Sequence, residues 1–453
     1  MSAIATVNAG ARLDRLPVSA FHRRILRLIG LGMFFDGFDI YLGAAVLGTT
    51  LRSGFSTLGE NAAFVSSTFL GMMLGSLLTG FLGDRYGRRF TYQANLAVFG
   101  LASIAAAFAP NMTVLIALRF VMGLGLGAEN VVGYSTMTEF VPPARRGRWL
   151  GLIAVFVVTG LPVSALAAWL LVPQFGWRAM FVLGGVGALL VWQARKSLPE
   201  SPRWLESVGR RAEAEALMQV IEREASGGRL LPPPAPPPGP APSRSLSTLF
   251  APPLLGRMVL GCISLIVINT LIYGFITWLP TFFAKQGLSV ATSFGYSLIM
   301  ALGAPAGSLI GALLSARRTS VKINDITLAA FGFGFSMVLL AITPNVACAY
   351  VIGVAVGISS ITFMTASTAI VQLRSAPEMR GRVLALQAIV FLGSTPIGGP
   401  ILGWVCQQFG ARWGVMIGGL GALVAGGYGW RAARRLTDDQ TFAPKRDAVV
   451  AAH

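Results

Sequence analysis

Two aspartates lie three residues apart inside an apolar stretch near the N-terminus, in the sequence FFDGFDIYLG. Asp36 and Asp39 share one face of a helix, because residues three positions apart are separated by only about 60° around the axis. A later apolar stretch contains Arg119 and Glu129. Ionisable groups in apolar segments are costly and mark functional sites, so these four residues are candidates for proton coupling.

Asp39 and Arg119 lie at the same depth if both stretches cross a membrane. Asp39 is 12 residues beyond Arg27, roughly 18 Å of helix, and Arg119 is 8 residues beyond Asn111, roughly 12 Å from the opposite surface. These depths coincide in a hydrocarbon core of about 30 Å. Two interpretations stay open: a pair whose separation drives proton uptake, and a static ion pair that fixes helix register.

Glu129 follows three glycines, Gly123, Gly125 and Gly127, which permit close approach of a helix or ligand. The glycine run is not a dinucleotide-binding fingerprint, because no strand precedes it and it lies in an apolar stretch. Glu129 therefore either lines a cavity or bonds to a neighbouring helix.

The composition predicts that these residues are positioned by transmembrane helices. The chain has 453 residues, of which 54% are hydrophobic and 12% charged, whereas soluble domains carry about a quarter charged residues. Twelve apolar stretches approach the roughly 20 residues needed to cross a membrane. They begin near Leu28, Ala62, Thr91, Met112, Trp149, Trp177, Met258, Ala291, Ile323, Asn345, Val383 and Trp413. Small residues such as those of Gly71-x3-Gly75 suit close helix packing.

The net charge of +18 follows the predicted topology. Of the 36 Lys and Arg residues, 31 fall in the two tails and in alternate connections. The five others are Arg52, Arg119, Arg178, Lys285 and Arg412. This positive-inside pattern predicts that both termini are cytoplasmic and accounts for the basic charge without nucleic-acid binding.

Few residues are available for metal or cofactor chemistry. Cys262, Cys348 and Cys406 fall within apolar stretches, and His22 and His453 lie in the tails. We therefore expect no metal site, no cofactor and no enzyme. The N-terminus lacks the apolar core of a cleavable signal peptide.

One long polar interruption separates six apolar stretches from six others. It divides the chain into an N-terminal bundle (1–194), a cytoplasmic loop (195–256) and a C-terminal bundle with a short tail (257–453). Residues 203–226 have the composition of a surface helix, and LPPPAPPPGPAPS is typical of an extended linker. The predicted fold class is an all-α integral membrane protein with twelve transmembrane helices in two six-helix bundles.

The connection between the second and third stretches carries a specific motif, Gly83-Asp84-Arg85-Tyr86-Gly87-Arg88-Arg89. With Gly80 it resembles the G-x-x-x-D-R-x-G-R-R signature of the major facilitator superfamily. The resemblance implies a cytoplasmic gate that latches and releases by ion pairing. A solvated positive loop is the alternative, which explains the arginines but not the aspartate or the glycine spacing.

Two further motifs are similar to those of the sugar porters within that superfamily. Glu139-x-x-Pro142 precedes Arg146-Gly147, and Pro199-Glu200-Ser201-Pro202-Arg203 follows the sixth stretch. The resemblance implies that Glu139, Arg146, Glu200 and Arg203 belong to the same inward-side charge network. The alternative is helix capping. In the second half, Ser315–Ser320 lacks the aspartate and glycines of the first loop, and Arg374 replaces the carboxylate, so a symmetric gate is not expected.

The D-G-F-D sequence around Asp36 and Asp39 resembles the aromatic-acid proton symporters, and in sugar porters an aspartate of the first span faces an arginine of the fourth. These resemblances imply a secondary active transporter of a bacterial inner membrane. It would take up a small organic metabolite, such as an aromatic or other organic acid, together with protons. Rival interpretations are a proton-driven exporter, which the last two stretches resemble, and a non-transporting nutrient sensor.

Polar side chains within the apolar stretches are candidates for contacting the solute, although each one also suits interhelical hydrogen bonding. They are Gln93, Glu129, Asn130, Asn269, Tyr273, Trp278 and Gln387. The expected partners are an organic solute, protons and the lipid bilayer, and we expect a monomer.

Overall fold

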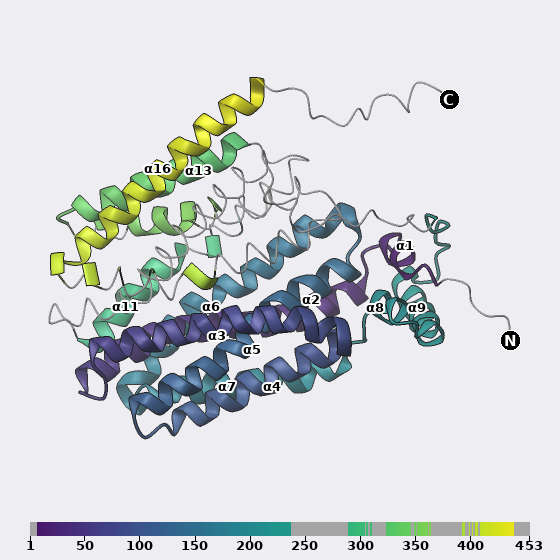
Figure 1. Cartoon of the computed structure of the whole chain (residues 1–453), viewed down its shortest axis with the longest axis horizontal. Helices are drawn as coiled ribbons and strands as arrows, with labels where there is room; N and C mark the ends of the chain where they lie inside the picture. The colour runs from purple at the N-terminus through teal and green to yellow at the C-terminus, as the bar shows by residue number, and fades with distance from the viewer. Residues whose placement is uncertain are drawn as a thin grey trace.

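The structure is a computed structural model of the chain. It describes residues 7–236, 289–303, 323–345, 351–360 and 411–438, with short stretches between residues 305 and 409. Within these residues every regular element is a helix. Figure 1 shows long helices lying roughly side by side, with a group of short helices at one end.

The first half of the chain forms six long helices. They are α2 (Ala20–Arg52), α3 (Leu58–Tyr86), α4 (Arg88–Ala107), α5 (Met112–Phe140), α6 (Arg146–Phe175) and α7 (Arg178–Ala194). Local signals start two of them, because the side chains of Thr57 and Asn111 accept hydrogen bonds from the first turns of α3 and α5. Each helix covers one of the six apolar stretches predicted in this half.

The helix lengths match a bilayer. By length and composition, α3, α4, α5 and the Pro143–Phe175 segment that contains α6 can each cross a membrane. α7 has 17 residues, about 25 Å of helix. α2 has 33 residues, about 50 Å, so it projects beyond a hydrocarbon core of about 30 Å.

Glycines bring α3 and α5 into backbone contact. A Cβ atom built at Gly75 would overlap the carbonyl oxygen of Leu124, and one at Gly127 would overlap that of Met72. Gly71 and Gly123 face each other across the same contact. The close packing predicted for Gly71-x3-Gly75 is thus present between α3 and α5.

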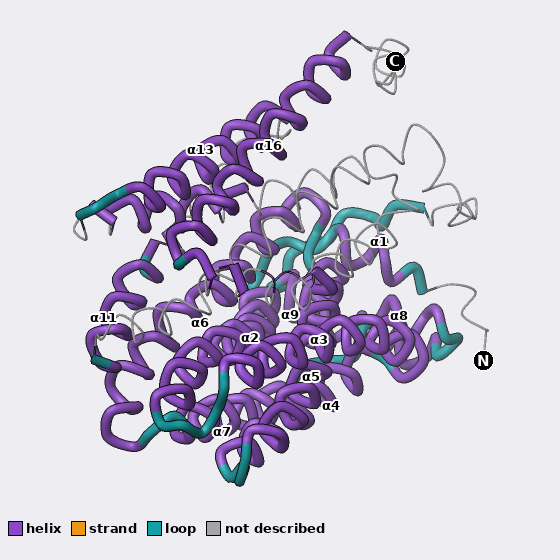
Figure 2. The backbone as a smooth tube through the Cα atoms, turned by 60° about the vertical axis from the view of Figure 1, so that its left-hand side comes forward, coloured by secondary structure: helices purple, strands orange, loops and turns teal. Residues whose placement is uncertain are grey.

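The described part of the second half includes α11 (Val290–Ala301), α13 (Ile323–Ile342), a helix at Val351–Ser360 and α16 (Ala411–Asp438). α13 and α16 pack at Gly334 and Gly419, where a Cβ on either would meet the other's carbonyl oxygen at 3.0 Å. α11 lies along α6, and Phe294 and Ala301 join the core of the first half (Figures 1 and 2). The stretches predicted near Met258 and Val383 lie outside the described residues.

Three short helices gather at one end of the bundle: α1 (Ala9–Asp14), α8 (Pro202–Ser207) and α9 (Arg211–Ser226). The start of α2 lies at this end too (Figure 1). The prediction of a single helix over residues 203–226 is wrong, because the structure has two helices there. The helical segment breaks between α8 and α9, where Gly209 has a positive φ of 81° that a glycine adopts without strain.

The contact of Gly75 with the α5 backbone leads to a stability prediction, for which Gly80 on the same helix provides a matched control. Gly75→Ala should lower the free energy of unfolding by about 1–3 kcal/mol, because the new methyl group overlaps the α5 backbone. Gly80→Ala should leave stability unchanged or raise it, because nothing lies within 4 Å of that position. Thermal unfolding of the purified proteins is the measurement, and equal melting temperatures for the two variants would contradict the contact.

Candidate functional site

Asp39 and Arg119 form an ion pair inside the helix bundle. Asp39 on α2 is 0% exposed and Arg119 on α5 is 1% exposed. The Arg119 Nη1 atom lies 2.6 Å from Asp39 Oδ2, and its Nη2 donates to the Asp39 carbonyl oxygen at 3.3 Å. The pairing that was predicted from their depths is therefore present.

The Arg119 guanidinium is also held by α3. Its Nε donates to Thr68 Oγ1 at 3.0 Å, and its Cζ lies 4.8 Å from the centroid of the Phe64 ring. Helices α2, α3 and α5 thus meet at one cation. A guanidinium with carboxylate, hydroxyl and aromatic partners can remain charged away from water.

Asp36 lies one turn away from Asp39 on α2 and is also fully buried. Neither of its carboxylate oxygens has a hydrogen-bond partner among the residues that the structure describes. Glu129, Arg195 and Asp39 are the charged groups that act on it electrostatically. The expected sharing of one helix face with Asp39 is therefore present, but Asp36 has no counter-charge of its own within the described part of the chain.

Glu129 forms an ion pair with Arg195, and both residues are 1% exposed. Arg195 starts the 3₁₀ helix η2 (Arg195–Ser197) directly after α7, and its Nε and Nη2 donate to the carbonyl oxygens of Leu28 and Ile29. Of the two interpretations of Glu129, the structure shows bonding to a neighbouring element. Arg195 is the first residue of the loop predicted over 195–256, so the sequence did not indicate this partner.

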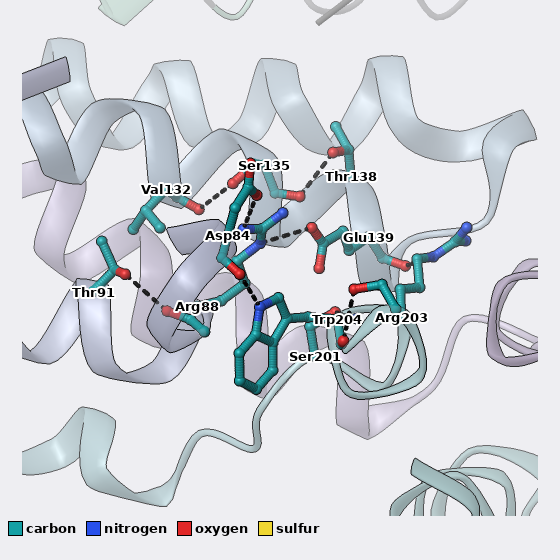
Figure 3. A network of polar contacts seen from close by, with 12 residues as sticks. Asp84, Arg88, Thr91, Val132, Ser135, Thr138, Glu139, Ser201, Arg203 and Trp204 are labelled. Atoms are coloured by element: carbon teal, nitrogen blue, oxygen red, sulfur yellow. Dashed lines mark hydrogen bonds and ion pairs between the residues drawn. The ribbon is translucent and has the colours of Figure 1, made fainter. Parts of the chain in front are cut away.

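The loop between α3 and α4 carries a network of polar contacts (Figure 3). Arg88 donates from Nη1 to Asp84 Oδ1 at 2.9 Å and from Nε to Glu139 Oε1 at 3.0 Å. The ring N–H of Trp204 donates to the Asp84 carbonyl oxygen at 2.8 Å. The network therefore joins the ends of α3, α4 and α5 to α8.

Glu200 fastens the turn at Gly87. Its carboxylate accepts the backbone N–H groups of Arg88 and Arg89 at 2.9 and 3.2 Å, and that of Ser201 at 2.8 Å. Gly87 has φ of 94°, and a side chain there would overlap the carboxylate. Burial raises the pKa of Glu200, the three backbone hydrogen bonds lower it, and the net shift is upward.

The remaining residues of the loop motif differ in their contacts. Arg89 donates from Nη2 to the Lys196 carbonyl oxygen at 2.9 Å. Gly83 is buried, and a Cβ there would lie 3.0 Å from Arg88 Nη1. Arg85 is exposed, with its Cζ 5.7 Å from the Tyr86 ring centroid, so the structure places it outside the ion-pair network.

Arg146 and Arg203 converge on a residue that the sequence analysis did not identify, Asp14 of α1. Their Nη2 atoms lie 2.8 and 2.7 Å from Asp14 Oδ1. Arg203 Nε also donates to the backbone carbonyl oxygen of Glu139 at 3.1 Å, not to its carboxylate. The only sequence signal for Asp14 is a lone acidic residue in a basic tail.

The N-terminal helix α1 is docked on α8 and α9 by charged groups. The Glu206 carboxylate accepts the N–H groups of Val7, Asn8 and Ala9 at 2.8 Å each. Arg12 lies 2.5 Å from Glu215 Oε2 and 2.7 Å from Glu222 Oε2. The side-chain hydrogen bond from Arg12 lowers the pKa of the Glu215 carboxyl. α1 is thus part of the loop network and not a free tail.

The residues proposed to contact solute are only partly described. Gln93 and Asn130 are half-buried, and Gln93 Nε2 has no hydrogen-bond partner among the residues that the structure describes. Asn95, which the sequence did not indicate, lies two residues further along α4 and is buried. Its Nδ2 likewise has no hydrogen-bond partner among the described residues. Asn269, Tyr273, Trp278 and Gln387 lie outside the described residues.

Comparison with known proteins agrees with this arrangement. Residues 29–399 match the sequence profile of the Major Facilitator Superfamily. The chain belongs to the major facilitator superfamily. It is therefore a transporter, and the fold of this superfamily, twelve transmembrane helices in two six-helix bundles, confirms the predicted fold class.

Two curated relatives are transporters of metabolites. The inner membrane metabolite transport protein YdjE of Escherichia coli is 38% identical over 313 residues, which cover 67% of this chain and 69% of that protein. The niacin transporter NiaP of Acinetobacter baylyi is 36% identical over 307 residues, covering 68% and 70% of the two chains. These relatives place the transporter among the metabolite transporters of the superfamily, as a multi-pass inner membrane protein.

Solved structures share the fold at low identity. The proton:xylose symporter XylE, bound to 6-bromo-6-deoxy-D-glucose, aligns with a TM-score of 0.70 and 17% identity over 91% of this chain and 96% of that one. A partially occluded inward open conformation of XylE from Escherichia coli aligns with a TM-score of 0.71 and 15% identity, covering 91% and 99%.

Proposed function

We propose that this transporter is a proton-coupled symporter that takes up a small organic acid by alternating access. The observation that carries the proposal is the buried ion pair between Asp39 and Arg119. The relatives that transport niacin or other metabolites support the substrate class. Niacin is itself a small aromatic acid, and we propose it as the first substrate to test.

Electrical neutrality gives the pair a coupling role. When Asp39 binds a proton, it no longer neutralises Arg119, and the guanidinium is free to bind the carboxylate of an organic acid. Neither the proton alone nor the anion alone leaves this buried site neutral, and a net charge in a low-dielectric bundle is unfavourable. The two therefore bind together, which is the condition for symport.

This mechanism predicts a specific defect for Asp39→Asn. The variant should lose niacin accumulation driven by an inward proton gradient but retain exchange of niacin between compartments of equal pH. Asparagine cannot exchange a proton, although its amide oxygen still accepts a hydrogen bond from Arg119. Uptake into proteoliposomes with a defined pH gradient is the measurement.

The control for that experiment is Glu60→Gln, which removes a half-buried carboxylate from the first turn of α3. It should accumulate niacin as the wild type does. Accumulation by Asp39→Asn against the niacin gradient would show that Asp39 does not carry the proton. Accumulation that requires the opposite proton gradient would show that the protein is an exporter.

We propose that the loop network around Asp84 is the cytoplasmic gate. Asp84→Asn should slow the transport rate while substrate affinity stays within several-fold of the wild type, because the loop lies at the end of α3, away from the buried pair. Arg85→Gln is the matched control, since this neighbour lies outside the network. Equilibrium binding and transport rate, measured on the same variants, distinguish gating from substrate binding. Loss of binding in folded Asp84→Asn would exclude a gating role.

We propose that the end of the bundle with α1, α8 and α9 faces the cytoplasm, so that both termini are inside. The distribution of basic residues supports this orientation. In a variant lacking the three native cysteines, a cysteine at Pro236 should resist an impermeant thiol reagent added to intact cells. A cysteine at the exposed Ser53, between α2 and α3, should react. The reverse pattern would invert the topology.

A further inference from the structure

The buried charges of the first bundle do not balance. Three carboxylates, Asp36, Asp39 and Glu129, are buried with two guanidiniums, Arg119 and Arg195. Each guanidinium is paired with one carboxylate, which leaves Asp36 without a counter-charge among the described residues. An isolated ionised carboxylate in an apolar bundle takes up a proton in preference to remaining charged.

Among the residues that the structure describes, the surroundings of Asp36 provide no other means of stabilising its charge. Its two oxygens have no hydrogen-bond partner within the part of the chain that the structure describes. The charged groups that act on it are Asp39 on its own helix, Glu129 on α5 and Arg195 directly after α7. Helix α6, which packs against α2 at Gly37 and Gly160, contributes none beyond its first turn.

Arg195 and Glu129 lie close to Asp36 along α2. Their ion pair packs over the backbone at Gly32, where a Cβ would overlap the Arg195 guanidinium and lie 2.9 Å from Glu129 Oε1. Gly32 and Asp36 are four residues apart, so both lie on one face of the helix. Glu129 and Asp36 therefore face the same cation from the same side of α2.

We propose that Asp36 and Glu129 form a second proton-binding site, in which the two carboxyl groups hold one proton against the single positive charge of Arg195. The bound proton resides on Asp36 while Arg195 is paired with Glu129. This site is separate from the pair of Asp39 and Arg119. It extends the proposed proton coupling and rests on that function for its role in transport, but occupancy by a proton is an equilibrium property that is measured without substrate.

Arg195 is the positioning residue of this site, because it connects the site to the cytoplasmic loop network. The next residue, Lys196, accepts a hydrogen bond from Arg89 through its carbonyl oxygen. The Arg195 guanidinium also lies over the ring of Tyr92, whose hydroxyl donates to the Leu198 carbonyl oxygen at 3.3 Å. Movement of the loop therefore shifts the counter-charge that determines which carboxylate is ionised.

Infrared spectroscopy of the purified full-length protein tests the site, because a protonated carboxyl group has a C=O stretch distinct from that of a carboxylate. Near neutral pH, the difference spectrum between the wild type and Asp36→Asn should contain one protonated carboxyl band. Glu129→Gln should lose the same band, because Arg195 then neutralises Asp36. Arg195→Gln should show about twice the band intensity, because both carboxylates lose their cation.

Glu213→Gln is the control, since this exposed carboxylate of α9 is paired with Arg210 and its removal should leave the band unchanged. Thermal unfolding identifies folded variants, and Glu129→Gln decides the outcome if Arg195→Gln fails to fold. A wild-type band that persists in Asp36→Asn, or is absent altogether, overturns the proposal. That result would not affect the outcome of the Asp39→Asn transport test. Conversely, if Asp39→Asn still accumulates niacin, the infrared band still reports whether Asp36 is protonated.

Discussion

Each guanidinium buried in the first bundle has a carboxylate against it, and the arrangement of α2, α5 and α7 depends on this pairing. Arg119 on α5 meets Asp39 on α2, and Arg195 after α7 meets Glu129 on α5. Rotating α2 by one residue, about 100°, would separate Asp39 from Arg119 and leave two uncompensated charges. The ion pairs thus select one register among the many that apolar packing alone would permit.

Such pairing requires helices that approach one another closely, and glycine provides that approach. On α2, a Cβ at Gly37 would overlap the Val157 carbonyl oxygen of α6, while Gly160 of α6 lies against the α2 backbone at Phe38. These two glycines put α2 and α6 in backbone contact, as Gly75 and Gly127 do for α3 and α5, and helices packed this closely have little room to move separately. The first bundle is therefore expected to move as one body against the second, which fits the rocking motion of alternating access.

Hydropathy and motif spacing predicted the six helices of the first half and the pairing of Asp39 with Arg119, because membrane thickness constrains depth. Contacts between elements that are distant in the sequence could not be predicted in the same way. In the sequence, Arg195 is one more basic residue of the long polar interruption, and only the turn after α7 brings it back into the bundle. Asp14 and Glu206 are likewise ordinary polar residues until α1 lies against α8 and α9. Local patterns carry no information on such long-range contacts.

The segment that follows α7 connects the two sets of charges. Its first residue, Arg195, holds Glu129, and five residues later Glu200 holds the backbone of the loop at Gly87. Five residues of extended chain span at most about 18 Å, and η2 shortens this further, so the loop cannot move far without pulling on Arg195. A guanidinium drawn away from a buried carboxylate changes the electrostatic energy of that carboxylate more than any surface contact could. This short connection is therefore a direct physical route from the loop between α3 and α4 to the buried carboxylates.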